Sequence, residues 1–322
     1  MKEYKSILKF FAKICLVLAV SLLLIFIANL FYVKYGIWHD EESCRFYNIP
    51  DKIDVCNFGN SHAYYGFSYE QYPDNGFNFA QTGQLFGVDK IVLDNYIDRL
   101  SDGAIVFINV SYISMLNEVD RSTDINKPEG VRYYRILPKK DIPDYSLFTD
   151  ICYHWCPVLT SYDYFLDTIY DFVRGKGPER PVSYLDDSKF ADAAYKTYEK
   201  HYERRKENDG SIMWCEEKID SLENIVEALR GKNVNIFLIT LPTSREYLDC
   251  FEEYSDGYLS RFDEKVREIA EKYGIEYLDY GTDARICDNH RYFRDADHMN
   301  QDGATAFMNI LKDEVIDAYL SK

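Results

Sequence analysis

A serine with neighbours suited to nucleophilic chemistry lies in the segment Gly59-Asn60-Ser61-His62. The segment follows an apolar run that ends at Phe58, and its glycine lets the chain turn sharply. A serine at such a strand-to-helix turn presents its hydroxyl above the sheet, and its backbone N–H can stabilise an oxyanion. Serine and asparagine also favour turns and helix caps for structural reasons. The segment alone is therefore weak evidence for a nucleophile at Ser61.

A carboxylate and an imidazole occur together much later in the chain, in Asp295-Ala296-Asp297-His298. A spacing of three residues lets Asp295 bond one ring nitrogen of His298 within a single turn, which leaves the other nitrogen free as a base. A helix is expected to start just after the pair, and its N-terminus disfavours the imidazolium form. We therefore expect a neutral base at rest. The alternatives are a helix-capping cluster and a metal site, although the spacing matches no recognised zinc pattern; we expect neither metal nor cofactor.

The elements that must position these motifs alternate between apolar strands and amphipathic helices. Strands are predicted at 52–58, 77–80, 104–110, 234–241 and 275–280, and helices at 84–100, 189–205, 215–230, 259–273 and 301–319. This alternation predicts an α/β fold, a three-layer, doubly wound parallel sheet of the flavodoxin-like type with helices on both faces. Ligands of such sheets bind beyond the carboxyl ends of the strands, and both motifs lie near such loops.

Taken together, the two motifs resemble those of the SGNH (GDSL-like) hydrolase superfamily, over residues 52–116 and 215–320. In that family the serine lies in a block near the N-terminus, and Asp and His form a C-terminal D-x-x-H block. The resemblance implies that Ser61 is the nucleophile, that His298 is the base, and that Asp295 orients it. The stretch N-F-A-Q-T-G-Q is similar to the second block of the family, which implies that the N–H groups of Gly83 and Ser61 hold the oxyanion.

The third block of the family departs from the expected pattern. It usually reads G-x-N-D, with the Asn donating to the oxyanion, whereas the corresponding strand here ends I-N-V-S-Y. Asn109 is the nearest candidate for that donor. Some membrane-anchored members lack the block, including the D-alanine transfer protein of teichoic-acid modification and alginate-type O-acetylation proteins, and the chain resembles that branch.

Two residues beside Ser61 are candidate substrate contacts, His62 and Tyr64. Neighbours in a turn rarely face one another, so we interpret His62 as a substrate contact or a structural residue and not as the base. The pattern G-x-S-x-A also approaches the nucleophile elbow of the α/β-hydrolases. That fold places more strands ahead of its serine and does not need Asp and His three residues apart, so we rank it lower.

An uncharged apolar segment of 20 residues runs from Ile14 to Val33. At about 1.5 Å per residue it matches a hydrocarbon core of roughly 30 Å. It is longer than the apolar region of a signal peptide, and no A-x-A site follows it, so we predict an uncleaved anchor at 14–33. Four lysines lie in residues 1–13 and only Lys34 lies close after the span, so the positive-inside rule leaves the N-terminus cytoplasmic. We expect a stalk at 34–50 and an extracellular domain at 51–322 of a cell-membrane protein.

Within the outer domain, residues 117–213 contain much Pro, Asp and Tyr and show no sustained period over their first part. We predict a helical, aromatic-rich insertion over the sheet that serves as a lid or a substrate platform.

The composition restricts the partners. The chain has a net charge of −17, and because residues 1–13 carry +3, the remainder carries about −20, which disfavours nucleic acid. The resemblance implies action on acyl groups of cell-envelope or exported polysaccharide. It also implies a membrane-bound O-acyltransferase or acyl carrier as partner, since an outward-facing enzyme has no direct access to cytosolic thioesters. Transfer and hydrolysis both stay open, and the alternative is a non-catalytic glycan-binding or envelope-assembly protein on the same fold.

Overall fold

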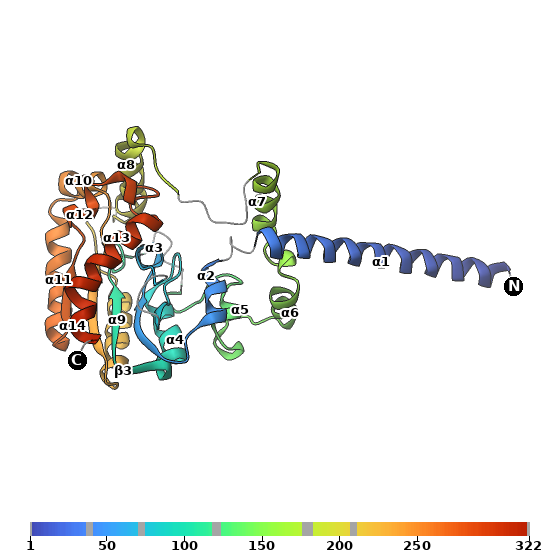
Figure 1. Cartoon of the computed structure of the whole chain (residues 1–322), viewed down its shortest axis with the longest axis horizontal. Coiled ribbons are helices and arrows are strands. Elements are labelled where there is room, and N and C mark those ends of the chain that lie inside the picture. Colours follow the sequence, from blue (N-terminus) through green and yellow to red (C-terminus); the bar gives the residue numbers. More distant parts are fainter. Residues whose placement is uncertain are drawn as a thin grey trace. The chain divides into compact units, whose positions relative to one another are not determined.

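The computed structural model describes residues 2–36, 41–69, 75–117, 124–175, 183–206 and 211–320 (Figure 1). The chain divides into two compact units. The first, the helical unit, combines Met1–Tyr47 with Glu129–Pro181, and the second, the sheet unit, combines Asn48–Pro128 with Val182–Lys322. The helical unit thus contains the central part of the predicted insertion.

A five-stranded parallel sheet organises the sheet unit, in the order β2-β1-β3-β4-β5. The strands are β1 Ile53–Phe58, β2 Gly76–Asn78, β3 Leu100–Asn109, β4 Asn235–Thr240 and β5 Glu276–Asp279. This is the flavodoxin-like strand order, whose direction of winding reverses between β1 and β3. The predicted doubly wound α/β fold is therefore confirmed, and loops that follow β1 and β3 are expected to meet at the ligand-binding edge.

The central strands are buried on both faces, and most of their residues are apolar. The register places Val55 beside Ile105 and Cys56 beside Val106, and all four side chains are fully buried. Successive residues of a strand point to opposite faces, so both faces of the sheet are covered, as parallel sheets require.

Helices complete the layers of the sheet unit. The α-helices are α3 Ser61–Gly66, α4 Phe86–Tyr96, α8 Phe190–His201, α9 Glu216–Arg230, α10 Arg245–Tyr254, α11 Tyr258–Tyr273, α12 Ala284–Cys287, α13 Gln301–Leu311 and α14 Asp317–Leu320, with a π-helical segment Lys312–Ile316 before the last. Short 3-10 helices of this unit span Ile97–Arg99, Asp187–Lys189, Glu203–Arg205 and His290–Tyr292. Those of the helical unit span Lys139–Asp141 and Pro157–Leu159, and Arg45–Asn48 lies at the boundary of the two units. On one face, Phe67 just after α3 contacts both Phe107 of β3 and Phe307 of α13.

The structure differs from the predicted elements in two places. The helix predicted at 84–100 ends at Tyr96, because a 3-10 turn intervenes and Leu100 already pairs with Ile53 at the start of β3. Helix α10 was not predicted. It begins after Ser244, whose side chain caps the N–H of Tyr247.

The helical unit contains α1 Lys2–Tyr35, α2 Glu41–Cys44, α5 Tyr133–Ile136, α6 Leu147–Trp155 and α7 Tyr162–Val173. The segment Lys9–Tyr35 of α1 is long and apolar enough to cross a membrane, which agrees with the anchor predicted at 14–33. Its C-terminal end packs on α7, where Phe31 makes edge-to-face contacts with Phe165 and Phe172.

Candidate active site

The turn after β1 fixes the position of Ser61. Gly59 has a φ of 138°, and a Cβ there would lie 2.8 Å from the Cβ of Asn109, so both the conformation and the space require glycine. Asn60 caps α3 by accepting a hydrogen bond from the backbone N–H of His62 at 3.1 Å. Ser61 is the first residue of α3, where a backbone N–H has no partner within the helix.

The structure brings the three predicted triad residues together, although Ser61 and His298 are 237 residues apart in sequence. The Oγ of Ser61 lies 2.8 Å from Nε2 of His298. On the other side of the ring, Nδ1 of His298 lies 3.0 Å from Oδ1 of Asp295, which also accepts the backbone N–H of His298 at 2.8 Å. These contacts have the order hydroxyl, imidazole, carboxylate that general-base activation of a serine needs.

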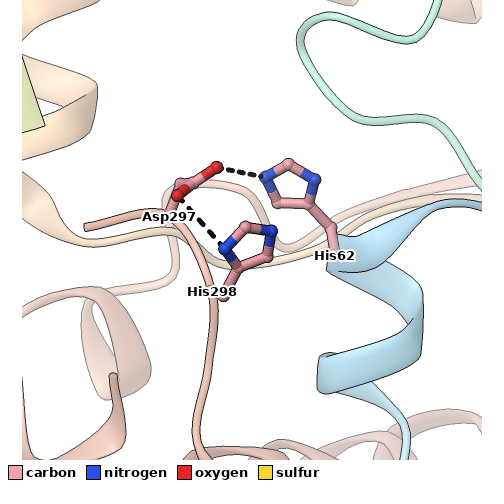
Figure 2. A group of neighbouring side chains, drawn as sticks. All are labelled: His62, Asp297 and His298. Carbon is pink, nitrogen blue, oxygen red and sulfur yellow. Dashed lines mark ion pairs between the residues drawn. The ribbon is translucent and has the colours of Figure 1, made fainter. Parts of the chain in front are cut away.

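A second carboxylate, Asp297, also meets this histidine. Its Oδ1 lies 3.2 Å from Nδ1 of His298, and its Oδ2 lies 3.3 Å from Nε2 of His62 and 3.4 Å from Nδ1 of His201. Figure 2 shows Asp297 between His62 and His298. Unlike Asp295, Asp297 is buried. The contacts of Asp297 with His298, His62 and His201 were not predicted from the sequence. The signal for them was the second acid of D-A-D-H together with a histidine directly after the serine.

Burial and charge act in opposite directions on these groups. Burial lowers the pKa of His298, but the carboxylates of Asp297 and Asp295 outweigh it and raise the pKa to about 10. Burial likewise raises the pKa of Asp297, but the His298 and His62 rings hold it well below its usual range. This direction is opposite to the neutral base at rest that the sequence led us to expect, because the two carboxylates favour the imidazolium.

The turn that contains Gly83 is hydrogen-bonded to the turn that contains Ser61. The N–H of Gln81 donates to the carbonyl of Gly59 at 3.2 Å, and Gly83 has a φ of 66° in the turn that Gln84 closes. A buried carboxylate joins the same two turns, since Oδ1 of Asp89 accepts from the N–H of Gly59 at 3.0 Å and from Gln84 at 2.6 Å. Burial raises the pKa of Asp89 to about 7, although the two hydrogen bonds act to lower it. Asp89 was not identified as a site residue from the sequence. The only signal was its position next to Val88, on the apolar face of the helix predicted at 84–100.

Asn109 is the last residue of β3 and is fully buried. Its Nδ2 donates to Oδ1 of Asn60 at 3.2 Å, and Nδ2 of Asn60 donates in turn to the Oγ of Ser111 at 2.9 Å. The amide of Asn109 thus holds the residue before the serine. Its predicted role as an oxyanion donor stays a prediction, as does that of Gly83.

The two predicted substrate contacts are both buried. His62 is 6% exposed, and its ring nitrogens face Asp297 and, at 3.3 Å, Oδ1 of Asn60. Tyr64 is 8% exposed and belongs to the apolar core of the sheet unit, and its contact with a substrate stays a prediction. Tyr65 lies instead beside His298, with the two rings edge-to-face at 5.3 Å, and the Arg294 guanidinium lies over the Tyr65 ring at 4.2 Å. The sequence analysis did not identify Tyr65.

The residues His62, Asp297 and His298 also have the donor types of a metal site, with one ligand atom of each within 4.8 Å of the others. Direct contacts of 3.2 and 3.3 Å already join the carboxylate to both rings, and Nδ1 of His298 is shared with Asp295. These contacts favour an ion-paired network of side chains over a metal centre.

Of the comparisons with known proteins, the one with solved structures finds similar chains. No family model matches the sequence, and no curated protein does. A candidate platelet activating factor from Streptococcus pneumonia aligns at 15% identity and a TM-score of 0.40, over 93% of this chain and 99% of that one. A candidate acylhydrolase from Bacteroides fragilis aligns at 13% identity and a TM-score of 0.38, over 85% and 93%, and a candidate GDSL-like lipase from Parabacteroides merdae at 11% and 0.32, over 82% and 97%. Similarity this low leaves the function to be argued from the geometry of the site.

Proposed function

We propose that the chain is a membrane-anchored serine esterase or O-acyltransferase of the SGNH type, with Ser61 as its nucleophile. The observation that carries the proposal is the 2.8 Å contact between the Oγ of Ser61 and Nε2 of His298. Two motifs from opposite ends of a domain meet at the switch point of a doubly wound sheet, where ligands of such folds bind. A pair of structural caps would not need a hydroxyl and an imidazole nitrogen in contact.

The first half of the reaction forms an acyl-serine. Oγ of Ser61 attacks the carbonyl carbon of an acyl ester, and its proton passes to Nε2 of His298. The tetrahedral oxyanion is stabilised by the backbone N–H of Ser61 and that of Gly83, which lies in the turn bonded to Gly59 through Gln81. His298 then gives the proton to the leaving oxygen, and the bond from the carbonyl carbon to that oxygen breaks.

The second half returns the serine. Nε2 of His298 takes a proton from a water or a sugar hydroxyl, whose oxygen attacks the carbonyl carbon of the acyl-serine. The bond from that carbon to Oγ then breaks, and His298 returns the proton to Oγ of Ser61. Orientation by the positive-inside rule places the acceptor outside the cell membrane, so the acceptor class we propose is cell-envelope or exported polysaccharide. The acyl group would come from a membrane-bound O-acyltransferase or acyl carrier.

Labelling with a fluorophosphonate probe tests the nucleophile. We expect the full-length wild-type chain to be labelled and Ser61→Ala to lose the label, because the probe reports an activated serine. Ser188→Ala removes an exposed serine of the same unit and should label like the wild type. A folded wild-type chain without label would contradict the enzyme and favour the non-catalytic glycan-binding or assembly protein.

Product analysis then separates transfer from hydrolysis. The wild-type chain is incubated with an acetyl ester, with and without an oligosaccharide acceptor, and acetylated sugar and free acetate are measured. Acetylated sugar that depends on Ser61 would identify a transferase, and acetate alone would identify an esterase. Envelope O-acyl content in a strain carrying Ser61→Ala would connect either activity to the cell.

A further inference from the structure

The helical unit exposes two apolar stripes. On α6 they are Phe148, Ile151 and Trp155, which are 74%, 52% and 82% exposed. On α7 the side chains of Leu166, Ile169 and Val173 are 46%, 39% and 79% exposed. Each set has the spacing i, i+3, i+7, which places its members along one side of a helix. We call these six residues the apolar face.

The apolar face is additional to the packing that α6 already makes. Cys152 and Tyr153 form the buried side of the helix, and the hydroxyl of Tyr153 lies 2.6 Å from Oγ of Ser43. Ile151 and Trp155 also line an open cavity of about 480 Å³. Apolar surface left exposed in this way marks a site of interaction.

The position of the apolar face relative to α1 indicates what it contacts. The segment between α6 and α7 donates the N–H of Val158 to Oδ1 of Asn29 at 3.4 Å, and Phe172 of α7 packs against Tyr35 with the ring centroids 5.0 Å apart. Asn29 lies four residues before the end of the predicted span, which is about 6 Å inside it at the rise of an α-helix. Figure 1 shows α6 and α7 on opposite sides of the C-terminal end of α1, with α7 packed against it. Both helices are therefore held at the level where the span leaves the hydrocarbon.

We propose that α6 and α7 lie in the outer interface of a phospholipid bilayer, with the apolar face inserted at the boundary of headgroups and acyl chains. Interfacial helices bury an apolar side about 5–10 Å deep in this region, and aromatic side chains such as Trp155 are enriched there. The proposal rests on the proposed anchor at 14–33. It adds a second contact with the same membrane, which fixes the helical unit on the bilayer surface instead of leaving it at the end of a single helix.

Quenching by brominated lipid tests the proposal on the full-length chain. The protein is reconstituted in vesicles of phosphatidylcholine and phosphatidylglycerol, with or without bromine on the upper part of the acyl chains. The difference between the wild type and Trp155→Phe isolates the emission of Trp155 from that of the other tryptophans, Trp38 and Trp214. Because Trp155 is exposed, its replacement should leave the fold intact. We expect most of the Trp155 emission to be lost in the brominated vesicles.

A probe on the second helix and a flotation control complete the test. Val173→Trp in the Trp155→Phe background should be quenched in the same way. Vesicles are first floated in a density gradient, so a chain that fails to float contradicts the anchor and not the interface. A chain that floats with either probe unquenched overturns the proposal, and an unquenched probe that is also shielded from aqueous acrylamide points to a protein partner instead. Fluorophosphonate labelling of Ser61 is read separately, so these failures stay distinct from failure of the proposed chemistry.

Discussion

The site has an open half and a buried half, and both meet at His298. In the open half are Ser61 and Asp295, whose side chain is 43% exposed. In the buried half are Asp297, His62 and His201, where one carboxylate, 4% exposed, lies within 3.4 Å of three imidazoles. The open half has the geometry of a serine nucleophile with its base, whereas the buried half is a charge network that reacts with nothing itself.

The difference in burial separates two functions of a carboxylate. A charge in a dry environment acts on its neighbours far more strongly than a solvated one. Asp297 is the largest favourable influence on the charge of His298. Asp295 makes the shortest contact with Nδ1, at 3.0 Å, and is itself held by two backbone N–H groups. We infer that Asp295 orients the ring and that Asp297 sets its protonation state.

The largest expected effect is on stability, in the matched pair Asp297→Asn and Asp295→Asn. Both changes keep the shape of the side chain and remove its charge. Asp297→Asn should cost about 3–5 kcal/mol in the free energy of unfolding, because it leaves the buried imidazolium of His298 without its strongest counter-charge. Asp295→Asn should cost about 1 kcal/mol or less, because its partly exposed charge is screened by water. Urea unfolding of the detergent-solubilised chain measures both values.

The pair is its own control, since the two positions are two residues apart and undergo the same chemical change. Equal losses of stability would contradict the division into halves. A larger loss for Asp295→Asn would reverse it and make Asp295 the buried partner in solution.

The sequence predicted the open half and missed the buried one for a physical reason. Ser61, Asp295 and His298 belong to motifs whose spacing implies contact. Asp297 is adjacent to His298, and whether such neighbours can share a proton depends on the turn between them, which no periodicity describes. His201 comes from the end of α8, within the predicted insertion, and only the tertiary fold brings it to Asp297.

The fold was predictable where burial dictates the residue types. The runs 104–110 and 234–241, which form most of β3 and β4, are largely apolar because parallel strands are covered on both faces. Helix α10 could not be recognised in the same way, because it is rich in acidic residues and directly follows a proline-containing loop. The exposure of the apolar stripes of α6 and α7 could not be predicted from the sequence, because it depends on which side of each helix the rest of the unit covers.

The pH dependence of turnover tests which of the two carboxylates sets the protonation state of His298. The base must be unprotonated to accept the serine proton, and the pKa of His298 is raised to about 10. We therefore expect kcat/KM to rise from neutral pH towards about 10. Asp297→Asn should move this rise to lower pH, because it removes the largest stabilisation of the imidazolium, and Asp295→Asn should move it less. The measurement is the pH profile of ester hydrolysis.

A profile that is already flat at neutral pH in the wild type would contradict the raised pKa. A wild-type rise that Asp297→Asn leaves in place would show that the buried half does not set the protonation state. Thermal melting at each pH, with the same variants, excludes unfolding as the cause of a change in rate.

The smallest expected effect concerns His201, the outermost group of the buried half. Burial lowers the pKa of His201 to about 4, although Asp297 partly opposes it. The unfolded chain binds this proton below about 6.5, so between that pH and about 4 the proton favours unfolding and stability falls as pH falls. His201→Gln removes the titration and should lessen the acid-side loss of Tm by about 2–4 °C. An acid slope that His201→Gln does not alter would mean that His201 is already solvated, and the buried half would then end at His62.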